Sequence, residues 1–337
     1  MKKAKLNTII EEQDGPTAVF DINDNDKKPK YKKIVFLICV ALVGLVILIN
    51  ITASLFFSLS LFKKDGLKAF KEYSYGKMES EQTGWVSDNS EKIEFENADG
   101  KKLKALGIEN EHISHSYIII CHRYGESPET MEEYAKHFYD LGFNIIMPYM
   151  RGHGESSCDN ISFGWNDRLD IAEWVEYIVK NDKKSKIALF GVSLGANAVT
   201  LAATEKLPEN VRLVVADSCY TSVESVVKEY LKNETSFSSA MGVEIISVFA
   251  ENKIGEKLKN TDTIAQLNKI QVPIMFINGE NDTVVPPLES KKLYENCNAK
   301  GVEEVIIEDG THGRNLQSDR DTYWANVDVF ILNNIGI

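Results

Sequence analysis

The sequence predicts an α/β fold, in which helices cover both faces of a mostly parallel sheet. Short, mostly apolar runs such as 117–121, 143–147 and 186–190 recur along the chain and are typical of strands buried on both faces. Segments with helical periodicity separate these runs, and a hairpin pattern precedes the first of them. Alternation of this kind is characteristic of parallel strands joined by helical crossovers.

An apolar segment near the amino terminus predicts a transmembrane helix. Residues 34–62 contain no ionisable side chain apart from the thiol of Cys39, and about 20 apolar residues suffice to cross a bilayer. A buried core helix would show a polar face. A cleaved signal peptide would have a shorter apolar run, of roughly 7–15 residues. We therefore expect an uncleaved anchor, preceded by a disordered tail (1–33) and followed by an amphipathic connector (63–88).

Lysines flank the apolar segment on both sides, with a small excess on the amino-terminal side. The tail is therefore expected in the cytoplasm, because basic residues favour that side. A long carboxy-terminal domain can be translocated largely regardless of its charge, so we expect it outside the cell. The lysines before the segment are Lys27, Lys28, Lys30, Lys32 and Lys33, and those after it are Lys63, Lys64, Lys68 and Lys71.

The domain expected over residues 89–337 begins with a hairpin and continues with alternating strands and helices. Its first two strands, 93–95 and 103–108, flank an Asp-Gly pair, which favours a tight hairpin turn. Residues 221–269 show helical patterns without a clear strand, so we expect a helical lid over the carboxyl ends of the strands. Six further strands are expected at 117–121, 143–147, 186–190, 211–216, 272–277 and 302–307, with helices at 127–141, 167–179, 196–203, 288–297 and 321–333.

Residues 186–195 join a buried-strand pattern directly to the turn Gly-Val-Ser-Leu-Gly. Gly191 and Gly195 keep side chains out of a sharp turn, so the hydroxyl of Ser193 stands clear of the sheet. Small residues compatible with a helix follow at 196–203. Strand, tight turn and helix together are the context of a nucleophile elbow. We predict that Ser193 is a catalytic nucleophile, with an ordinary strand-to-helix turn as the alternative.

A serine hydroxyl is a weak nucleophile at neutral pH, so it needs a histidine to accept its proton and an acid to orient that histidine. Asp282 and His312 each lie in a glycine loop directly after an expected strand, which places both at the sheet edge that carries Ser193. The chain order serine, aspartate, histidine is the order expected for such a sheet. We predict a catalytic triad of Ser193, His312 and Asp282. Asp217, which also ends a strand, is the rival acid.

Two backbone N–H groups are expected to bind the oxyanion that forms when the serine attacks. One belongs to Leu194, directly after the nucleophile, and the other to Tyr124, in the loop after strand 117–121. In the same loop, Arg123 is either a solvent-facing charge or a guanidinium that binds a substrate carboxylate or phosphate. A second glycine loop at 151–156 is expected to shape the site, because its histidine precedes the nucleophile in the chain.

Composition excludes several other classes of protein. The chain of 337 residues is 43% hydrophobic and 26% charged, which is ordinary for a globular fold. Its formal net charge of -12 argues against nucleic-acid binding. Five cysteines are scattered without ligand-like spacing, so neither a metal site nor a disulfide framework is expected. No glycine loop matches a phosphate-binding pattern, and we expect no cofactor.

These motifs resemble those of the α/β-hydrolase superfamily and, more narrowly, of membrane-anchored, serine aminopeptidase-like hydrolases of low-GC Gram-positive bacteria. The resemblance implies the α/β-hydrolase fold with an eight-stranded sheet, the triad named above, and acyl transfer without a cofactor. Arg123 departs from the family pattern, which usually has glycine after the histidine. The resemblance covers residues 90–335 and rests on segments 122–125, 151–156, 191–195, 216–218, 279–286 and 310–312.

The function that the sequence favours is a serine hydrolase of the cell membrane, single-pass, with its catalytic domain outside the cell. It would cleave an ester, thioester or amide of a small-molecule or peptide substrate through an acyl-enzyme on Ser193. Two alternatives stay open: an acyltransferase on the same triad, and a non-catalytic surface protein on the same fold.

Overall fold

The computed structural model describes residues 30–76, 83–98, 100–234 and 239–336. The chain divides into two compact units, residues 1–49 and residues 50–337. Most of the expected tail, and Asp99 of the expected hairpin turn, lie outside the described residues.

A single long helix, α1 (Lys30–Leu61), contains the apolar segment. Its Tyr31–Leu61 part includes an 18-residue stretch with a mean hydropathy of 3.2, none of whose residues is buried. A helix of 31 residues is roughly 46 Å long, which exceeds the hydrocarbon thickness of a bilayer, about 30 Å. Length and composition therefore allow this helix to cross a membrane. It begins at Lys30, slightly before the predicted start.

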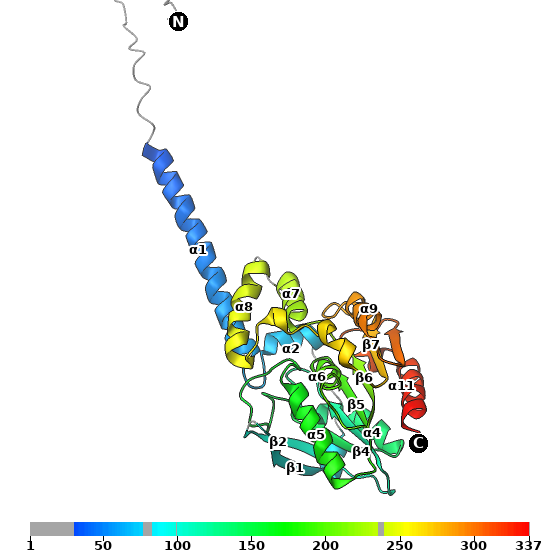
Figure 1. Cartoon of the computed structure of the whole chain (residues 1–337). Coiled ribbons are helices and arrows are strands. Elements are labelled where there is room, and N and C mark those ends of the chain that lie inside the picture. The colour runs from blue at the N-terminus through cyan, green and yellow to red at the C-terminus, as the bar shows by residue number, and fades with distance from the viewer. Residues whose placement is uncertain (1–29, 77–82, 99, 235–238, 337) are drawn as a thin grey trace, which may run out of the picture. The chain divides into compact units, whose positions relative to one another are not determined.

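Eight strands form one sheet in the order β1-β2-β4-β3-β5-β6-β7-β8 (Figure 1). The β1 and β2 strands form the expected antiparallel hairpin, and β2 also runs antiparallel to β4. The remaining neighbours are parallel. A mostly parallel sheet led by a hairpin is thus confirmed. The strands are β1 (Glu91–Glu96), β2 (Lys102–Ile108), β3 (Ser116–Cys121), β4 (Asn144–Pro148), β5 (Lys186–Val192), β6 (Val211–Asp217), β7 (Ile274–Gly279) and β8 (Val302–Ile307).

Helices cover both faces of the sheet, which explains the continuous apolar strands. In β5, for example, Leu189 belongs to one apolar core and Phe190 to another, because successive side chains point to opposite faces. The first core includes side chains of α5, α6 and α9, and the second includes side chains of α3, α4 and α11. These helices are α3 (Trp85–Asn89), α4 (Glu132–Asp140), α5 (Asp167–Asn181), α6 (Leu194–Ala202), α9 (Pro287–Asn296) and α11 (Arg320–Ile335), with the short α10 (Asn315–Ser318) before the last.

One residue expected in the core of α5 is exposed. Helical periodicity over 167–179 predicts Leu169 on the apolar face of this helix, together with Ile171, Trp174, Val175 and Ile178, but 39% of its surface is accessible. Residues turn by about 100° each around a helix, which places Leu169 almost opposite Trp174 and Ile178. Those two side chains are buried. The prediction for Leu169 is therefore wrong.

The insertion between β6 and β7 is helical, as predicted. It contains α7 (Val223–Glu234), α8 (Ser239–Ile254) and two short 3₁₀ helices, Leu258–Asn260 and Ile264–Lys269. In its described part, the β-structure consists of one isolated bridge, between Ser222 and Asp262. We refer to residues 221–269 as the lid.

The expected connector contains α2 (Lys68–Tyr75), which packs against the lid and reaches the sheet. Phe70 and Tyr73 of α2 both contact Tyr230 of α7, with ring centroids 5.2 and 5.0 Å apart. Tyr75, the last residue of α2, contacts Ser193, which directly follows β5. In Figure 1 α2 accordingly lies between the lid helices and α6.

Candidate active site

The turn at Ser193 has the backbone of a nucleophile elbow. The β5 strand ends at Val192 and α6 begins at Leu194, while Ser193 between them has φ 55° and ψ −112°. A positive φ at a non-glycine residue costs about 1–3 kcal/mol and persists only where the surroundings enforce it. A Cβ on Gly191 would lie 2.3 Å from the Gly195 backbone, and one on Gly195 would lie 2.1 Å from the carbonyl oxygen of Cys121. Both glycines are therefore required by close packing.

The structure brings the three predicted triad residues together. The Ser193 Oγ lies 2.8 Å from the Nε2 atom of His312, and the Nδ1 atom of His312 lies 2.7 Å from an oxygen of Asp282. All three side chains are at most 5% exposed. The other oxygen of Asp282 accepts hydrogen bonds from the N–H groups of Val284 and Val285, which fixes the orientation of the carboxylate. Such a series of hydrogen bonds can pass a proton from serine to histidine while the aspartate orients the ring.

Asp217, the rival acid, has a different set of partners. Its carboxylate accepts hydrogen bonds from Asn315 at 2.6 Å, from Ser218 at 2.9 Å and from Tyr323 at 3.0 Å. Complete burial raises its pKa. Asn315 lies shortly after His312 in the chain, so these bonds tie the end of β6 to the histidine loop. The geometry thus places Asp282, and not Asp217, against the histidine.

The two expected oxyanion donors differ in their surroundings. The residue Leu194 is the first of α6, so its N–H points out of a helix amino terminus, where negative charge is favoured. The N–H of Tyr124 instead donates to the phenol oxygen of Tyr75 at 3.2 Å. That phenol also donates to the Ser193 Oγ at 3.1 Å. Sequence analysis did not identify Tyr75.

The glycine loop at 151–156 supports the loop that carries Tyr124. The Nε2 atom of His153 accepts a hydrogen bond from the N–H of Gly125 at 2.9 Å, and His122 accepts one from the N–H of Met150 at 3.1 Å. The two imidazole rings are perpendicular, with centroids 4.9 Å apart. Burial lowers the pKa of both histidines, which keeps them neutral and able to accept these bonds.

Arg123 is inside the protein rather than at its surface. Its side chain is 1% exposed, and one guanidinium nitrogen donates to the carbonyl oxygen of Gly313 at 2.7 Å. The guanidinium carbon lies 5.3 Å from the centre of the Tyr75 ring. The expectation of a solvent-facing charge is therefore wrong, because the loop turns this side chain toward the residue after His312. Substrate binding by Arg123 stays a prediction.

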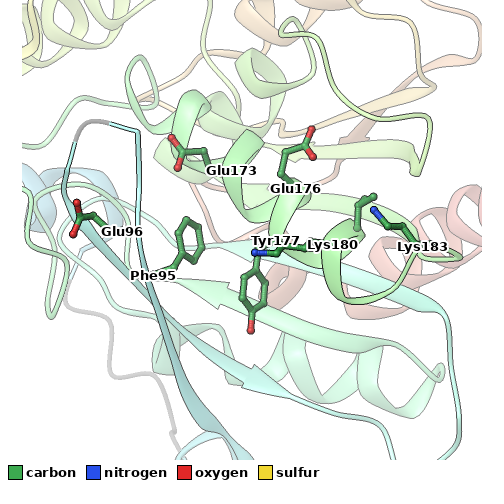
Figure 2. Close-up of a pocket in the computed structure, with 8 residues that line it drawn as sticks. Phe95, Glu96, Glu173, Glu176, Tyr177, Lys180 and Lys183 are labelled. Carbon is green, nitrogen blue, oxygen red and sulfur yellow. The ribbon is translucent and has the colours of Figure 1, made fainter.

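Little space is left around Ser193. The cavity at the serine has a volume of about 10 Å³, close to the minimum that holds one water molecule. Its walls are mostly apolar and include Phe70, Phe163, Leu194 and Val226. A larger hollow of about 530 Å³ lies between β1 and α5 (Figure 2). None of the predicted site residues is among those that line it. The lining residues are Phe95, Glu96, Glu173, Glu176, Tyr177, Val179, Lys180 and Lys183.

Comparison with known proteins agrees with this fold. Residues 113–247 match the model of the serine aminopeptidase S33 family. The matched segment includes the elbow and both glycine loops that precede it.

Two similar sequences come from a bacterium and a yeast. The uncharacterized protein YqkD of Bacillus subtilis is 26% identical over 224 residues, which are 66% of this chain and 73% of that protein. The uncharacterized membrane protein YNL320W of Saccharomyces cerevisiae is 22% identical over 245 residues, 72% of this chain and 79% of that protein.

Solved structures of enzymes share the fold at low sequence identity. The esterase Pf2001 of Pyrococcus furiosus superposes with a TM-score of 0.64 and 22% identity, covering 77% of this chain and 96% of the esterase. The acylaminoacyl peptidase of Pyrococcus horikoshii superposes with a TM-score of 0.56 and 16% identity, covering 73% of this chain and 41% of the peptidase.

Proposed function

We propose that this chain, which shares the α/β-hydrolase fold with solved esterases and peptidases, is a serine hydrolase that cleaves an ester, thioester or amide through an acyl-enzyme on Ser193. The observation that carries the proposal is the hydrogen-bond chain from Ser193 through His312 to Asp282, with contacts of 2.8 and 2.7 Å. These three side chains come from loops far apart in the sequence that follow different strands of one sheet.

In the proposed reaction, the Ser193 Oγ attacks the acyl carbonyl while its proton passes to the Nε2 atom of His312. Asp282 holds the imidazolium that forms. His312 then protonates the leaving alcohol, thiol or amine, and the acyl group stays on the serine. Water attacks this acyl-enzyme with His312 as base, which releases a carboxylic acid and free serine. The N–H groups of Leu194 and Tyr124 stabilise the oxyanion in both steps.

The substrate class is proposed from the relatives and the mechanism together. The two Pyrococcus enzymes are named as an esterase and an acylaminoacyl peptidase, which act on ester and amide bonds respectively. A small-molecule or peptide acyl substrate fits the same triad, and the scheme requires no cofactor.

We further propose that α1 is a single-pass membrane anchor and that the catalytic domain lies outside the cell. The length and apolar composition of α1 support the anchor, as does the name of the yeast relative. The outward orientation rests on the excess of lysines before the segment.

Labelling with a fluorophosphonate probe tests the proposed nucleophile. The full-length protein, purified in detergent, should react covalently, and Ser193→Ala should not. Ser157→Ala is the matched control, because that hydroxyl is exposed and donates to the carbonyl oxygen of Lys102. Equal labelling of wild type and Ser193→Ala would contradict the proposal. A series of p-nitrophenyl esters of graded length beside aminoacyl anilides would then identify the preferred acyl group.

A further inference from the structure

The helix α2 forms part of the active site, although it precedes the first strand of the sheet. Its Phe70 ring packs edge-on against Tyr124 and Phe163, with centroids 4.9 and 5.9 Å apart. The Tyr124 hydroxyl accepts a hydrogen bond from the N–H of Leu67, the residue before α2, at 2.7 Å. The helix is therefore attached to the very loop that carries an expected oxyanion donor.

The last residue of α2, Tyr75, occupies the position that a substrate oxyanion would need. Its phenol oxygen accepts from the N–H of Tyr124 at 3.2 Å and lies 3.1 Å from the Ser193 Oγ. An oxyanion must lie about 2.7–3.1 Å from the same N–H, so the phenol and the oxyanion cannot be present together. Burial raises the pKa of Tyr75, which keeps the phenol neutral and able to donate to the serine.

The Tyr75 ring is held by two charged or polar groups of the site. It stacks on the imidazole of His312, with centroids 5.6 Å apart and planes 12° from parallel. The guanidinium of Arg123 lies 5.3 Å from its centre, within the range of a cation–π contact. Tyr75 is only 3% exposed. Its position is thus fixed by several contacts and is not that of a loose surface side chain.

The same helix also fills the space for an acyl group. Phe70 and Ser74 of α2 line the cavity at Ser193, whose volume of about 10 Å³ cannot hold a substrate. Glycines flank α2 on both sides: Gly66 has φ 77° and Gly76 has φ 65°. Glycine tolerates such backbone angles and large changes in them, so both ends of α2 are suited to act as hinges.

We propose that Tyr75 is an internal plug of the oxyanion hole, and that α2 must carry its phenol away from Ser193 before a substrate carbonyl can bind. This inference rests on the proposed function. It makes the segment directly after α1 a gate of the active site, moving as a unit between Gly66 and Gly76. The phenol is a competitor of the substrate, and removing it should speed the reaction.

The variant Tyr75→Phe tests the plug, because it keeps the stacked ring and removes the oxygen. Losing the hydrogen bonds of the phenol to Tyr124 and Ser193 should open the oxyanion hole more often. We expect about a threefold to tenfold rise in the rate of fluorophosphonate labelling and in kcat/KM for a p-nitrophenyl ester. The measurements use the full-length protein in detergent.

Tyr294→Phe is the matched control, since it removes a phenol from α9, outside the proposed gate, at a position that is 41% exposed. Its rate should equal that of wild type. Thermal melting shows whether each variant folds. If Tyr75→Phe does not fold, Tyr75→Leu takes its place, because it also lacks the phenol oxygen and should also react faster than wild type.

The possible results separate the plug from the proposed function. An unchanged or lower rate in Tyr75→Phe, with labelling that still depends on Ser193, overturns the plug and leaves the hydrolase standing. A decrease would indicate that the phenol donates to the oxyanion during the reaction. Equal acceleration in Tyr294→Phe also overturns the plug, because the loss of any phenol would then explain both. Labelling independent of Ser193 in every variant overturns the proposed function and the plug together.

Discussion

Asp282 and Asp217 follow neighbouring strands of the sheet, and their hydrogen bonds assign them different tasks. Asp282 contacts the Nδ1 atom of His312, so Asp282→Asn should impair the orientation of the ring and lower kcat on the order of 10³–10⁴-fold. Asp217 accepts three hydrogen bonds from other side chains. In Asp217→Asn an NH2 group replaces one carboxylate oxygen, so a hydrogen-bond donor faces side chains that donate to the wild-type carboxylate. This mismatch should cost about 1–3 kcal/mol of stability.

Ester hydrolysis and urea unfolding of the two variants, measured side by side, check this assignment. Asp217→Asn should keep kcat within a few-fold of wild type under conditions in which it is folded. The opposite result, a large loss of kcat in Asp217→Asn with little effect in Asp282→Asn, would identify Asp217 as the orienting acid.

The two buried histidines, His122 and His153, should make stability depend on pH. Burial lowers the pKa of both from an ordinary value of 6.5, so the unfolded chain binds protons that the folded protein does not. The contribution of the two neutral histidines to the free energy of unfolding is then fully present above pH 6.5 and decreases as the pH falls below it. At one pH unit below that value, a histidine that stays neutral in the folded protein removes at most about 1.4 kcal/mol from the free energy of unfolding, and the loss should be larger for His122, whose pKa is lowered further.

Urea unfolding of wild type, His122→Gln and His153→Gln at pH 7.5 and pH 5.5 measures this effect. Each variant should lose less stability than wild type between the two pH values. His112→Gln, at an exposed histidine, is the matched control. Equal losses in wild type and both variants would show that these rings do not carry the pH dependence.

The elbow between β5 and α6 should tolerate no side chain at Gly195. A Cβ there would lie 2.1 Å from the carbonyl oxygen of Cys121 in β3, so Gly195→Ala must displace one backbone against the other. Overpacking of this kind costs about 1–3 kcal/mol, and the shift would also move the N–H of Leu194. We expect a lower Tm and a large loss of fluorophosphonate labelling.

Gly44→Ala is the control for this substitution, because a Cβ at Gly44 meets no atom within 4 Å. Thermal melting and labelling of both variants give the comparison. Normal melting and labelling in Gly195→Ala would mean that the close approach of β3 and the elbow is not needed for the site.

The elements that the sequence predicted well are those with a local signal. Buried strands appear as short, mostly apolar runs, and the elbow and the loops of Asp282 and His312 appear as glycine turns directly after such runs. The loop order then places Ser193, Asp282 and His312 at one sheet edge without any knowledge of side-chain packing.

The elements that the sequence missed depend on tertiary contacts. The α2 helix is eight residues long and precedes the sheet, so its periodicity contains no information on what it packs against. Its position is set by Tyr230 of the lid and by Tyr124. Arg123 is buried for a similar reason, since its partner Gly313 is distant in the sequence. Local patterns therefore predict the candidate triad residues but not the groups that cover them.

The chain as a whole combines a helix able to cross a membrane with an α/β-hydrolase fold, so its orientation decides which substrates the candidate site can meet. A hydrolase domain outside the cell would act on extracellular or surface acyl groups, and one inside would act on cytoplasmic esters, thioesters or peptides. The lysine distribution predicts the first arrangement.

The cysteines of the chain make this orientation measurable with a membrane-impermeant maleimide. Four of the five cysteines are buried, and the fifth, Cys39, lies in α1, so the wild-type protein should give little background. Leu288→Cys, at a site that is 60% exposed, should be labelled on intact cells if the domain is outside. Thr17→Cys, in the amino-terminal tail, should be labelled only after the cells are permeabilised. The reverse pattern would place the hydrolase domain in the cytoplasm, because the same reagent cannot reach it without permeabilisation.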